Sequence, residues 1–276
     1  MIRRPAPSLP APGQPPVILG IVNVTPDSFS DGGRFLHAEA AISHALRLLD
    51  EGADWVDVGG ESTRPGAAPV SHDEEITRVV PVIEGILQQR PNAIISIDTR
   101  HATVAAAAIA AGACIVNDVS GFADPEMPRV CAASGVTVVL MHMRGTPQTM
   151  QHDTHYDDLV EEVCLGLAAS VARARDVGIP DERIVVDPGV GFGKALEDNP
   201  TLIRELARVS ALGFPVLIGA SRKRFIGALT GQTDASQRIY GSLGAALAAD
   251  LAGARVLRVH DVRATVEALA VFRACR

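Results

Sequence analysis

The chain has 276 residues, of which 47% are hydrophobic and 21% charged, with a mean hydropathy of +0.19. This composition can build one large core, so it excludes disordered and fibrous classes. The net charge is −7 and the isoelectric point about 5.6, which excludes a nucleic-acid-binding protein because such proteins need a basic face. No apolar run approaches the roughly 18 residues of a membrane-spanning helix, so we expect no membrane contact.

Residues 1–16, MIRRPAPSLPAPGQPP, are rich in proline and lack the apolar segment of a secretory signal. We therefore expect a disordered leader at 1–16 and one folded domain over 17–276. The chain has four cysteines that lie far apart and match no metal-binding spacing: Cys114, Cys131, Cys164 and Cys275. Reduced thiols in a cytoplasmic protein are the expected state.

Short β-branched segments alternate with longer Ala- and Leu-rich segments of helical period. The predicted strands are 17–22, 55–58, 94–97, 114–117, 136–141, 184–186, 216–218 and 256–259. The predicted helices are 38–51, 73–89, 103–110, 124–133, 156–177, 199–212, 236–251 and 262–274. Eight βα units in series without a hairpin signal favour a single (β/α)8 TIM barrel over an open doubly wound sheet. In such a barrel the active site lies at the C-terminal ends of the strands.

Polar side chains follow several of the predicted strands. Asp98, Asn117 and Asp187 stand at the ends of the third, fourth and sixth strands. Each alone could cap a helix or pair with a nearby cation. Together they suit a ligand with an amidine-like edge, because a carboxylate accepts two parallel N–H bonds from such an edge. Pterin and guanine rings present that edge.

Cationic side chains collect at the same rim of an acidic protein. Arg64 lies in the loop after the second strand, Lys223 follows the seventh, and Arg258 and His260 belong to the end of the eighth. Any one of them could simply be solvated. Four converging cations indicate an anionic group on the substrate, a phosphate or pyrophosphate, which arginine binds bidentately.

Two long loops, 23–35 and 143–155, are longer than this architecture needs, and such loops are often functional. In the first of them, Asn23 and Asp31 are hard oxygen ligands that would suit magnesium beside a phosphate, although both could only shape a turn. The glycine-rich segment 189–194 lacks the first glycine and the Ser/Thr of a nucleotide P-loop. We expect its glycines to let the backbone approach a flat ligand.

Eight motifs stand in order at these strand ends: NVTPDSFSDGG, DVGGESTRPGA, SIDT, NDVSG, LMHM, DPGVGFGK, SRK and RVHD. From about residue 18 to 262 the chain closely resembles bacterial dihydropteroate synthase, a family of pterin-binding TIM barrels. The resemblance implies an enzyme of folate biosynthesis, a target of sulfonamides. Such an enzyme condenses 6-hydroxymethyl-7,8-dihydropterin diphosphate with p-aminobenzoate and releases pyrophosphate. It also implies a Mg²⁺ cofactor and a homodimer.

The resemblance also implies roles for single residues. The pterin ring would be held by Asp98, Asn117, Asp187, Lys223 and Arg258. The diphosphate would be held by Asn23, Thr63, Arg64, Arg258 and His260, with magnesium at Asn23 and Asp31. The p-aminobenzoate pocket would include Phe29, Thr63, Pro65 and Arg224. The implied mechanism is dissociative, with Asp98, Asp187, Lys223, Arg64 and His260 as its catalytic residues.

One position departs from many members of the family. Arg224 stands where serine commonly follows the SRK lysine. Its guanidinium could hold the p-aminobenzoate carboxylate, or it could point to solvent and leave only its backbone at the pocket.

Two other functions fit part of the pattern. A methyltetrahydrofolate-binding methyltransferase barrel would share the Asp and Asn side chains but would not need the cationic rim. A non-catalytic pterin-binding paralogue would be expected to lose residues from the first two loops, and the chain keeps them.

Overall fold

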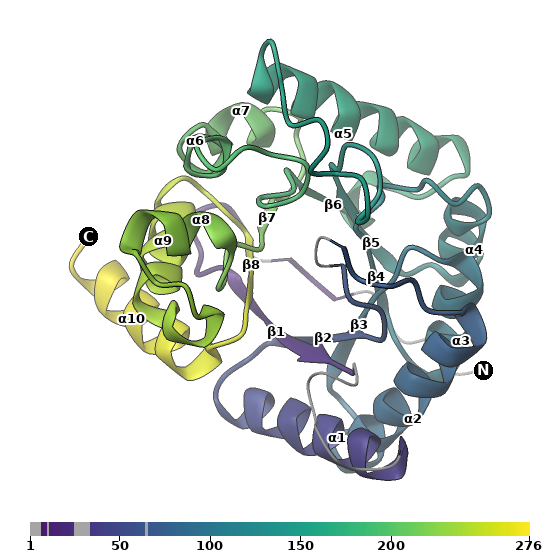
Figure 1. The fold of residues 1–276 in the computed structure, drawn as a ribbon. Coiled ribbons are helices and arrows are strands. Elements are labelled where there is room, and N and C mark those ends of the chain that lie inside the picture. The colour runs from purple at the N-terminus through teal and green to yellow at the C-terminus, as the bar shows by residue number, and fades with distance from the viewer. Residues whose placement is uncertain (1–6, 10, 25–33, 64–65) are drawn as a thin grey trace.

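The computed structural model describes residues 7–9, 11–24, 34–63 and 66–276. Figure 1 looks along the axis of a ring of strands that is surrounded by helices. Of the residues assigned a role above, Phe29, Asp31, Arg64 and Pro65 lie outside the described part of the chain.

Eight parallel strands line the centre of the molecule. They are β1 (Val17–Asn23), β2 (Trp55–Gly59), β3 (Ile94–Asp98), β4 (Ile115–Asp118), β5 (Thr137–Met141), β6 (Ile184–Asp187), β7 (Leu217–Ile218) and β8 (Val256–Val259). Their order in the sheet is β6-β5-β4-β3-β2-β1-β8-β7. A parallel bridge between Val186 and Val216 joins the two ends of the sheet and closes it. The predicted (β/α)8 barrel is confirmed.

Helices follow the strands and cover the outside of the ring (Figure 1). They are α1 (Arg34–Asp50), α2 (His72–Gln89), α3 (Ala102–Ala111), α4 (Met127–Ser134), α5 (Leu159–Asp176), α6 (Asp198–Arg204), α7 (Leu206–Ser210), α8 (Arg224–Thr230), α9 (Ile239–Leu251) and α10 (Val262–Ala274). Short 3₁₀ turns, η2 (Asp181–Arg183) and η3 (Ala235–Gln237), precede β6 and α9.

Apart from shifts of a few residues at helix ends, the helices differ from the sequence prediction in two places. The expected helix 199–212 is divided into α6 and α7, because Glu205 between them has φ −92° and ψ 18°, outside the helical region. Helix α8 was not predicted. It begins directly after Lys223 and ends at Thr230, and the following Gly231 has a left-handed φ of 73°, which terminates a helix at little cost.

Local signals in the sequence account for the ends of the longer helices. The Ser71 hydroxyl caps α2 by accepting the Glu74 N–H at 3.2 Å, and three acidic residues occupy the first turn of that helix. Asp158 caps α5 in the same way, with the Glu161 N–H at 3.1 Å, so α5 starts at Leu159 rather than at residue 156. These caps satisfy N–H groups that would otherwise have no partner.

The apolar core has two parts. The larger lies between the strands and the helices and is built mostly from Val, Ile, Leu and Ala. The smaller fills the barrel interior with Val17, Leu19, Trp55, Cys114, Ile115, Val139, Val185, Leu217 and Val256. The interior is therefore a packed layer of side chains and not a pore.

Part of the segment that we expected to be a disordered leader contacts the barrel. Leu9 packs against the interior cluster. The Arg273 guanidinium of α10 donates to the carbonyl oxygens of Gly13 and Gln14 at 3.1 and 3.0 Å. Residues 11–16 thus run along the barrel, while the division of the chain into leader and domain stays a prediction.

Among the residues that the structure describes, no helix combines the length and the apolar character needed to cross a bilayer.

Candidate active site

The inward-facing side chains change character along the strands. Alternate residues of a strand face the same side, so each interior residue is followed two positions later by another. Those pairs are Trp55 and Asp57, Ile115 and Asn117, Val185 and Asp187, and Val256 and Arg258. One step toward the C-terminal ends, a layer of polar and charged groups replaces the apolar layer, at the end of the barrel where a site is expected.

Arg258 connects this charged layer across the barrel. Its Nε donates to Asp57 Oδ2 at 2.6 Å, and its Nη2 donates to Asp98 Oδ2 at 2.6 Å. Asn117 Nδ2 also donates to Asp57 Oδ2, at 3.0 Å. The structure thereby brings together Asp98, Asn117 and Arg258 as predicted, and it adds Asp57, which the sequence analysis missed.

Two carboxylate oxygens of this layer are left without a partner. Asp57 Oδ1 and Asp98 Oδ1 are buried, and neither has a hydrogen bond to any described residue. Burial raises the pKa of Asp98; Arg258 opposes this shift, and the charge of Asp57 adds to it. A buried acceptor without a donor costs free energy, so a bound ligand that offers N–H groups would be stabilised here.

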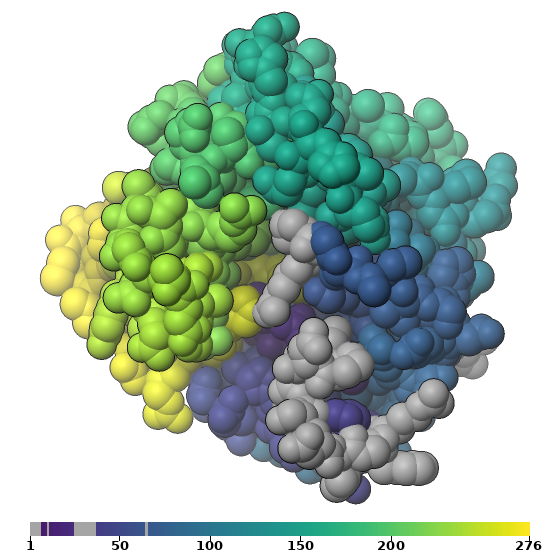
Figure 2. All heavy atoms as spheres, in the orientation of Figure 1, coloured from purple at the N-terminus to yellow at the C-terminus, as the bar shows by residue number. Residues whose placement is uncertain are grey.

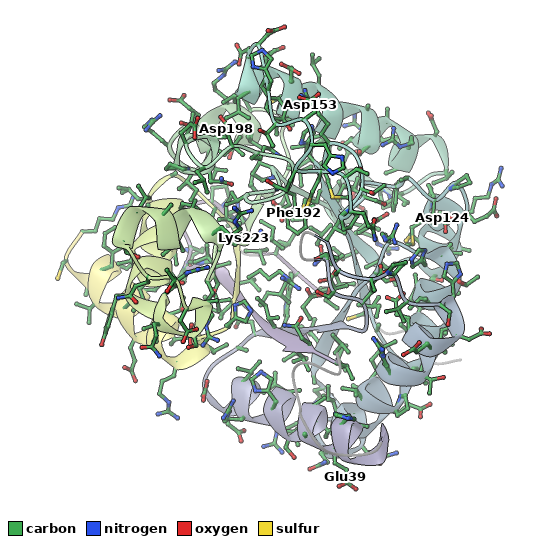
Figure 3. All side chains as sticks on the ribbon, viewed as in Figure 1. Glu39, Asp124, Asp153, Phe192, Asp198 and Lys223 are labelled. Carbon is green, nitrogen blue, oxygen red and sulfur yellow. The ribbon has the colours of Figure 1, made fainter. Side chains whose placement is uncertain are left out.

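Asp187 and Lys223 occupy the other side of the mouth. Asp187 Oδ1 accepts the Gly189 N–H at 2.7 Å. Burial raises the pKa of Asp187, against the attraction of the Lys223 charge. The Lys223 ammonium donates to the Val190 carbonyl and lies 4.3 Å from the centre of the Phe192 ring. Burial lowers the pKa of Lys223 to about 8. Figure 3 shows Phe192 and Lys223 close together above the barrel.

The glycines of segment 189–194 accommodate the protein's own atoms. A Cβ on Gly189 would lie 2.0 Å from the His142 carbonyl oxygen, and a Cβ on Gly191 would lie 2.7 Å from Lys223 Cδ. Both glycines also have positive φ, at 73° and 83°. Packing against His142 and Lys223 therefore already requires glycine at these two positions, and the approach of this segment to a flat ligand stays a prediction.

Of the residues expected at the anionic group, the structure describes Asn23, Thr63, Arg258 and His260, which lie at or after the C-terminal ends of β1, β2 and β8. The Ser221 hydroxyl is 3.0 Å from His260 Nδ1 and accepts the His260 N–H at 3.2 Å. Asn23 ends β1 in register with Gly59, and its side chain is half-buried. Thr63 follows β2 and is also half-buried. Arg224 is exposed as the first residue of α8.

Glu61, a carboxylate after β2 that the sequence analysis missed, connects two other segments of the chain. Glu61 Oε1 accepts the Val70 N–H at 3.3 Å, and Glu61 Oε2 accepts Arg100 Nε at 3.0 Å. Burial alone would raise the pKa of Glu61, but hydrogen bonds from His101, Arg100 and Val70 outweigh it and lower this pKa to about 2. The carboxylate is thus ionised at every physiological pH.

Glu61, Glu75 and His101 also offer ligand atoms within 4.8 Å of one another. Arg100 already pairs with Glu61 there, so its positive charge opposes a bound cation and we assign no metal to this group. Of the two residues predicted to hold magnesium, Asn23 presents an amide at the mouth. Asp31 lies outside the described residues.

The mouth is hollowed on the molecular surface. Figure 2 shows this face with purple atoms from the N-terminal part of the chain visible at depth between the surrounding loops. The charged layer therefore faces a concave end of the barrel, as small-molecule sites commonly do.

Comparison with known proteins decides the family. The model of the pterin binding enzyme family matches residues 19–260. Dihydropteroate synthase of Neisseria meningitidis serogroup C is 48% identical over 263 residues, which cover 94% of this chain and 92% of that protein. The Escherichia coli dihydropteroate synthase is 45% identical over 259 residues, covering 94% and 91%.

The chain belongs to the dihydropteroate synthase family.

A solved structure agrees with this assignment. Xanthomonas albilineans dihydropteroate synthase with 4-aminobenzoic acid is 50% identical, has a TM-score of 0.89, and matches over 94% of this chain and 93% of that chain. The predicted family, the transferase activity and the role in folate biosynthesis are confirmed. The named matches are synthases, so they do not support the methyltransferase alternative.

Proposed function

We propose that this dihydropteroate synthase joins p-aminobenzoate to 6-hydroxymethyl-7,8-dihydropterin diphosphate, and that the charged layer at the barrel mouth binds the pterin. The observation that carries the proposal is the group of Asp57, Asp98, Asn117 and Arg258, in which Asp98 Oδ1 is buried without a hydrogen-bond partner among the described residues. A pterin amidine edge would supply the missing donors. Related synthases are solved with 4-aminobenzoate and with 7,8-dihydropteroate.

Each residue of the layer has a distinct task toward the ring. Asp187 and Asp98 would accept its N–H groups from two sides, and Asn117 would bond its edge as donor and acceptor. Lys223 would donate to the ring carbonyl or a ring nitrogen. Arg258, oriented by its two carboxylate bonds, would stack its planar guanidinium on the ring face.

The diphosphate would lie at the outer rim against Asn23, Thr63, Arg64 and His260, with Arg258 beneath it. Asn23 offers an amide oxygen at the mouth, which fits a magnesium ion held together with Asp31. When bound, that ion would neutralise charge on the diphosphate. The side chains of Arg64 and His260 would bind the phosphate oxygens and hold the leaving group in place.

The substitution would proceed by cleavage before attack. The exocyclic C–O bond breaks, its electron pair leaves with pyrophosphate, and a cation spreads into the pterin ring. Asp98 and Asp187 stabilise that cation because two buried carboxylates face it. The p-aminobenzoate nitrogen then forms the C–N bond and loses a proton. Phe29, Thr63, Pro65 and Arg224 would surround the aromatic acid, and the exposed side chain of Arg224 is free to reach its carboxylate.

The reaction can be tested with purified protein, magnesium and both substrates. We expect pyrophosphate release that requires p-aminobenzoate and matches dihydropteroate formation one to one. Asp187→Asn and Arg64→Ala should each lower kcat/KM by about 100-fold or more, because each removes charge-assisted bonds of about 1.5–3 kcal/mol apiece. Pterin binding without release would indicate the non-catalytic paralogue, and near-wild-type rates in either variant would overturn its assigned role.

We further infer a homodimer. A groove of about 520 Å³ lies between α6, α8 and α9, away from the mouth, with Ile203, Phe225 and Ile226 among its lining residues. Leu229 and Leu251 beside it are 71% and 57% exposed. Exposed apolar patches of this kind commonly mark interfaces, and the second copy implied by the family resemblance would cover it. Sedimentation should give a dimer for the wild type and a monomer for Leu251→Glu; a monomeric wild type would contradict the inference.

A cytoplasmic location remains our proposal. The four cysteines are thiols in the structure, which supports a reducing compartment. Fractionation of the native organism would test it, and recovery in an extracellular or periplasmic fraction would contradict it.

A further inference from the structure

The ammonium of Lys194 is buried in the loop between β6 and α6, with 3% of the residue exposed. It lies 2.8 Å from the Phe192 carbonyl oxygen, 3.2 Å from the Gly189 carbonyl oxygen and 3.1 Å from His142 Nδ1. A lysine has three N–H donors, so these acceptors can use all of them. Burial lowers the pKa of Lys194 to about 7, whereas the negative charge of Asp187 and these acceptors favour the protonated form.

The neighbouring histidine is suited to accept one of these bonds. Burial, and then the charge of Lys194, lower the pKa of His142 to about 3. The imidazole is therefore neutral near pH 7, and its Nδ1 is an acceptor with the proton on Nε2. His142, which directly follows β5, thereby offers Lys194 its ring nitrogen and, at 3.4 Å, its backbone carbonyl.

The loop lies between two lysine ammonium groups. The carbonyls of Gly189 and Phe192 point to Lys194, whereas the carbonyl of Val190 points to Lys223. The Phe192 ring lies under the Lys223 ammonium. Residues 189–192 therefore bond to Lys194 and to Lys223. A shift of this segment would move the Val190 carbonyl and the Phe192 ring, which together position Lys223.

We propose that Lys194 is a positioning residue, an internal hydrogen-bond donor that holds residues 189–192 so that Val190 and Phe192 place Lys223 for pterin binding. The inference rests on the proposed pterin site, to which Lys223 belongs. Lys194 itself touches backbone and His142, not the mouth. Its loss should therefore weaken the binding of one substrate rather than disable the chemistry as a whole.

The direct test is Lys194→Met, which keeps the length of the side chain and removes all three donors. We expect KM for the pterin diphosphate to rise about 10- to 100-fold, because small displacements of binding groups have effects of this size. KM for p-aminobenzoate, measured at saturating pterin diphosphate, should stay within about 2-fold. The fluorescence of Trp55, the single tryptophan and part of the barrel interior, reports whether the variant is folded.

A matched control modifies the same loop away from Lys194. The Tyr156 hydroxyl donates to the Gly193 carbonyl at 2.8 Å, so Tyr156→Phe removes one bond to the loop but none to the ammonium. We expect its pterin KM to remain within about 3-fold of wild type. An equal rise in Tyr156→Phe and Lys194→Met would show general loosening of the loop and would overturn the proposal.

A second pair keeps the proposal testable where Lys194→Met does not fold. His142→Asn can present Oδ1 where the imidazole presents Nδ1, whereas His142→Leu has no acceptor. The leucine variant should raise the pterin KM and the asparagine variant should largely restore it. Equal values in the two variants, or a folded Lys194→Met with wild-type KM, would refute the role of Lys194. Absence of turnover in the wild type would instead refute the proposed function.

Discussion

Two layers of the barrel interior, two residues apart along the same strands, differ in what they bury. The layer around Trp55, Ile115 and Val185 is apolar and buried, and it stabilises the barrel by removing hydrocarbon from water. The layer above it, with Asp57, Asn117, Asp187 and Arg258, buries polar and charged groups at the mouth. The inward-facing residues of one strand can thus stabilise the barrel at one position and contribute to the active site two residues later.

The charged layer is stable only as a set. Replacing a buried ion pair by apolar residues is often neutral, but removing a single partner leaves a buried charge without compensation. Here one guanidinium serves two carboxylates, Asp57 and Asp98. The contrast therefore predicts that substitutions in the charged layer lower substrate affinity and that substitutions in the apolar layer lower stability. Arg258 is the exception, because its loss should lower both.

Arg258→Met should produce the largest effect. It leaves Asp57 and Asp98 buried without their cation, so we expect the free energy of unfolding to fall by about 3–5 kcal/mol and kcat/KM to fall by about 1000-fold. Denaturant titration and initial rates measure the two quantities. Arg263→Met, at an exposed position on α10, is the control and should change neither. A stable Arg258→Met would contradict the idea that the guanidinium stabilises the buried carboxylates.

A smaller effect is expected at Glu75, a fully buried carboxyl between α2 and β3. Burial raises its pKa to about 6, although the Thr99 hydroxyl opposes the shift. The folded-state pKa is above the unfolded value, so the wild type loses stability as pH rises from about 4.5 to 6 and the loss is complete above that. Relative to wild type, Glu75→Gln should gain about 2 kcal/mol between pH 4 and pH 7.5.

The control for Glu75 is Glu84→Gln, because Glu84 is exposed on the same helix. Glu75→Gln should show the larger pH-dependent difference from wild type. Unfolding at several pH values gives both curves, and a flat curve for Glu75→Gln would show that Glu75 is ionised in the fold without penalty.

The sequence was sufficient for the architecture because each strand is a short buried apolar run with a recognisable helix after it. The sequence did not predict α8, because the SRK motif stands directly before this helix and the cap residue Lys223 makes no capping hydrogen bond. The break at Glu205 also lacks a local signal, since glutamate is a good helix former. Both features depend on packing against neighbouring elements.

Site residues at the ends of strands were predicted, whereas Asp57, in the middle of β2, and two residues held by distant segments were missed. Asp57 lies within the strand WVDVG, and the sequence analysis considered only the loop that follows this strand. Asp57 is two residues after Trp55, so strand alternation would have placed its side chain in the barrel interior. Lys194 and Glu61 find their partners only after distant segments meet, such as His142 after β5 and Arg100 after β3. No spacing in the chain predicts those contacts.

The most direct test compares two positions on β6. Val185 belongs to the apolar layer and Asp187, two residues later, to the charged layer. In calorimetric titration with 6-hydroxymethyl-7,8-dihydropterin diphosphate, Asp187→Asn should bind about 100-fold or more weakly than wild type and unfold at a similar or higher temperature. Val185→Ala should bind within about 3-fold of wild type and lose about 2 kcal/mol of stability. Wild-type affinity in Asp187→Asn, or an equal loss of affinity in both variants, would contradict the assignment of the pterin site to the charged layer.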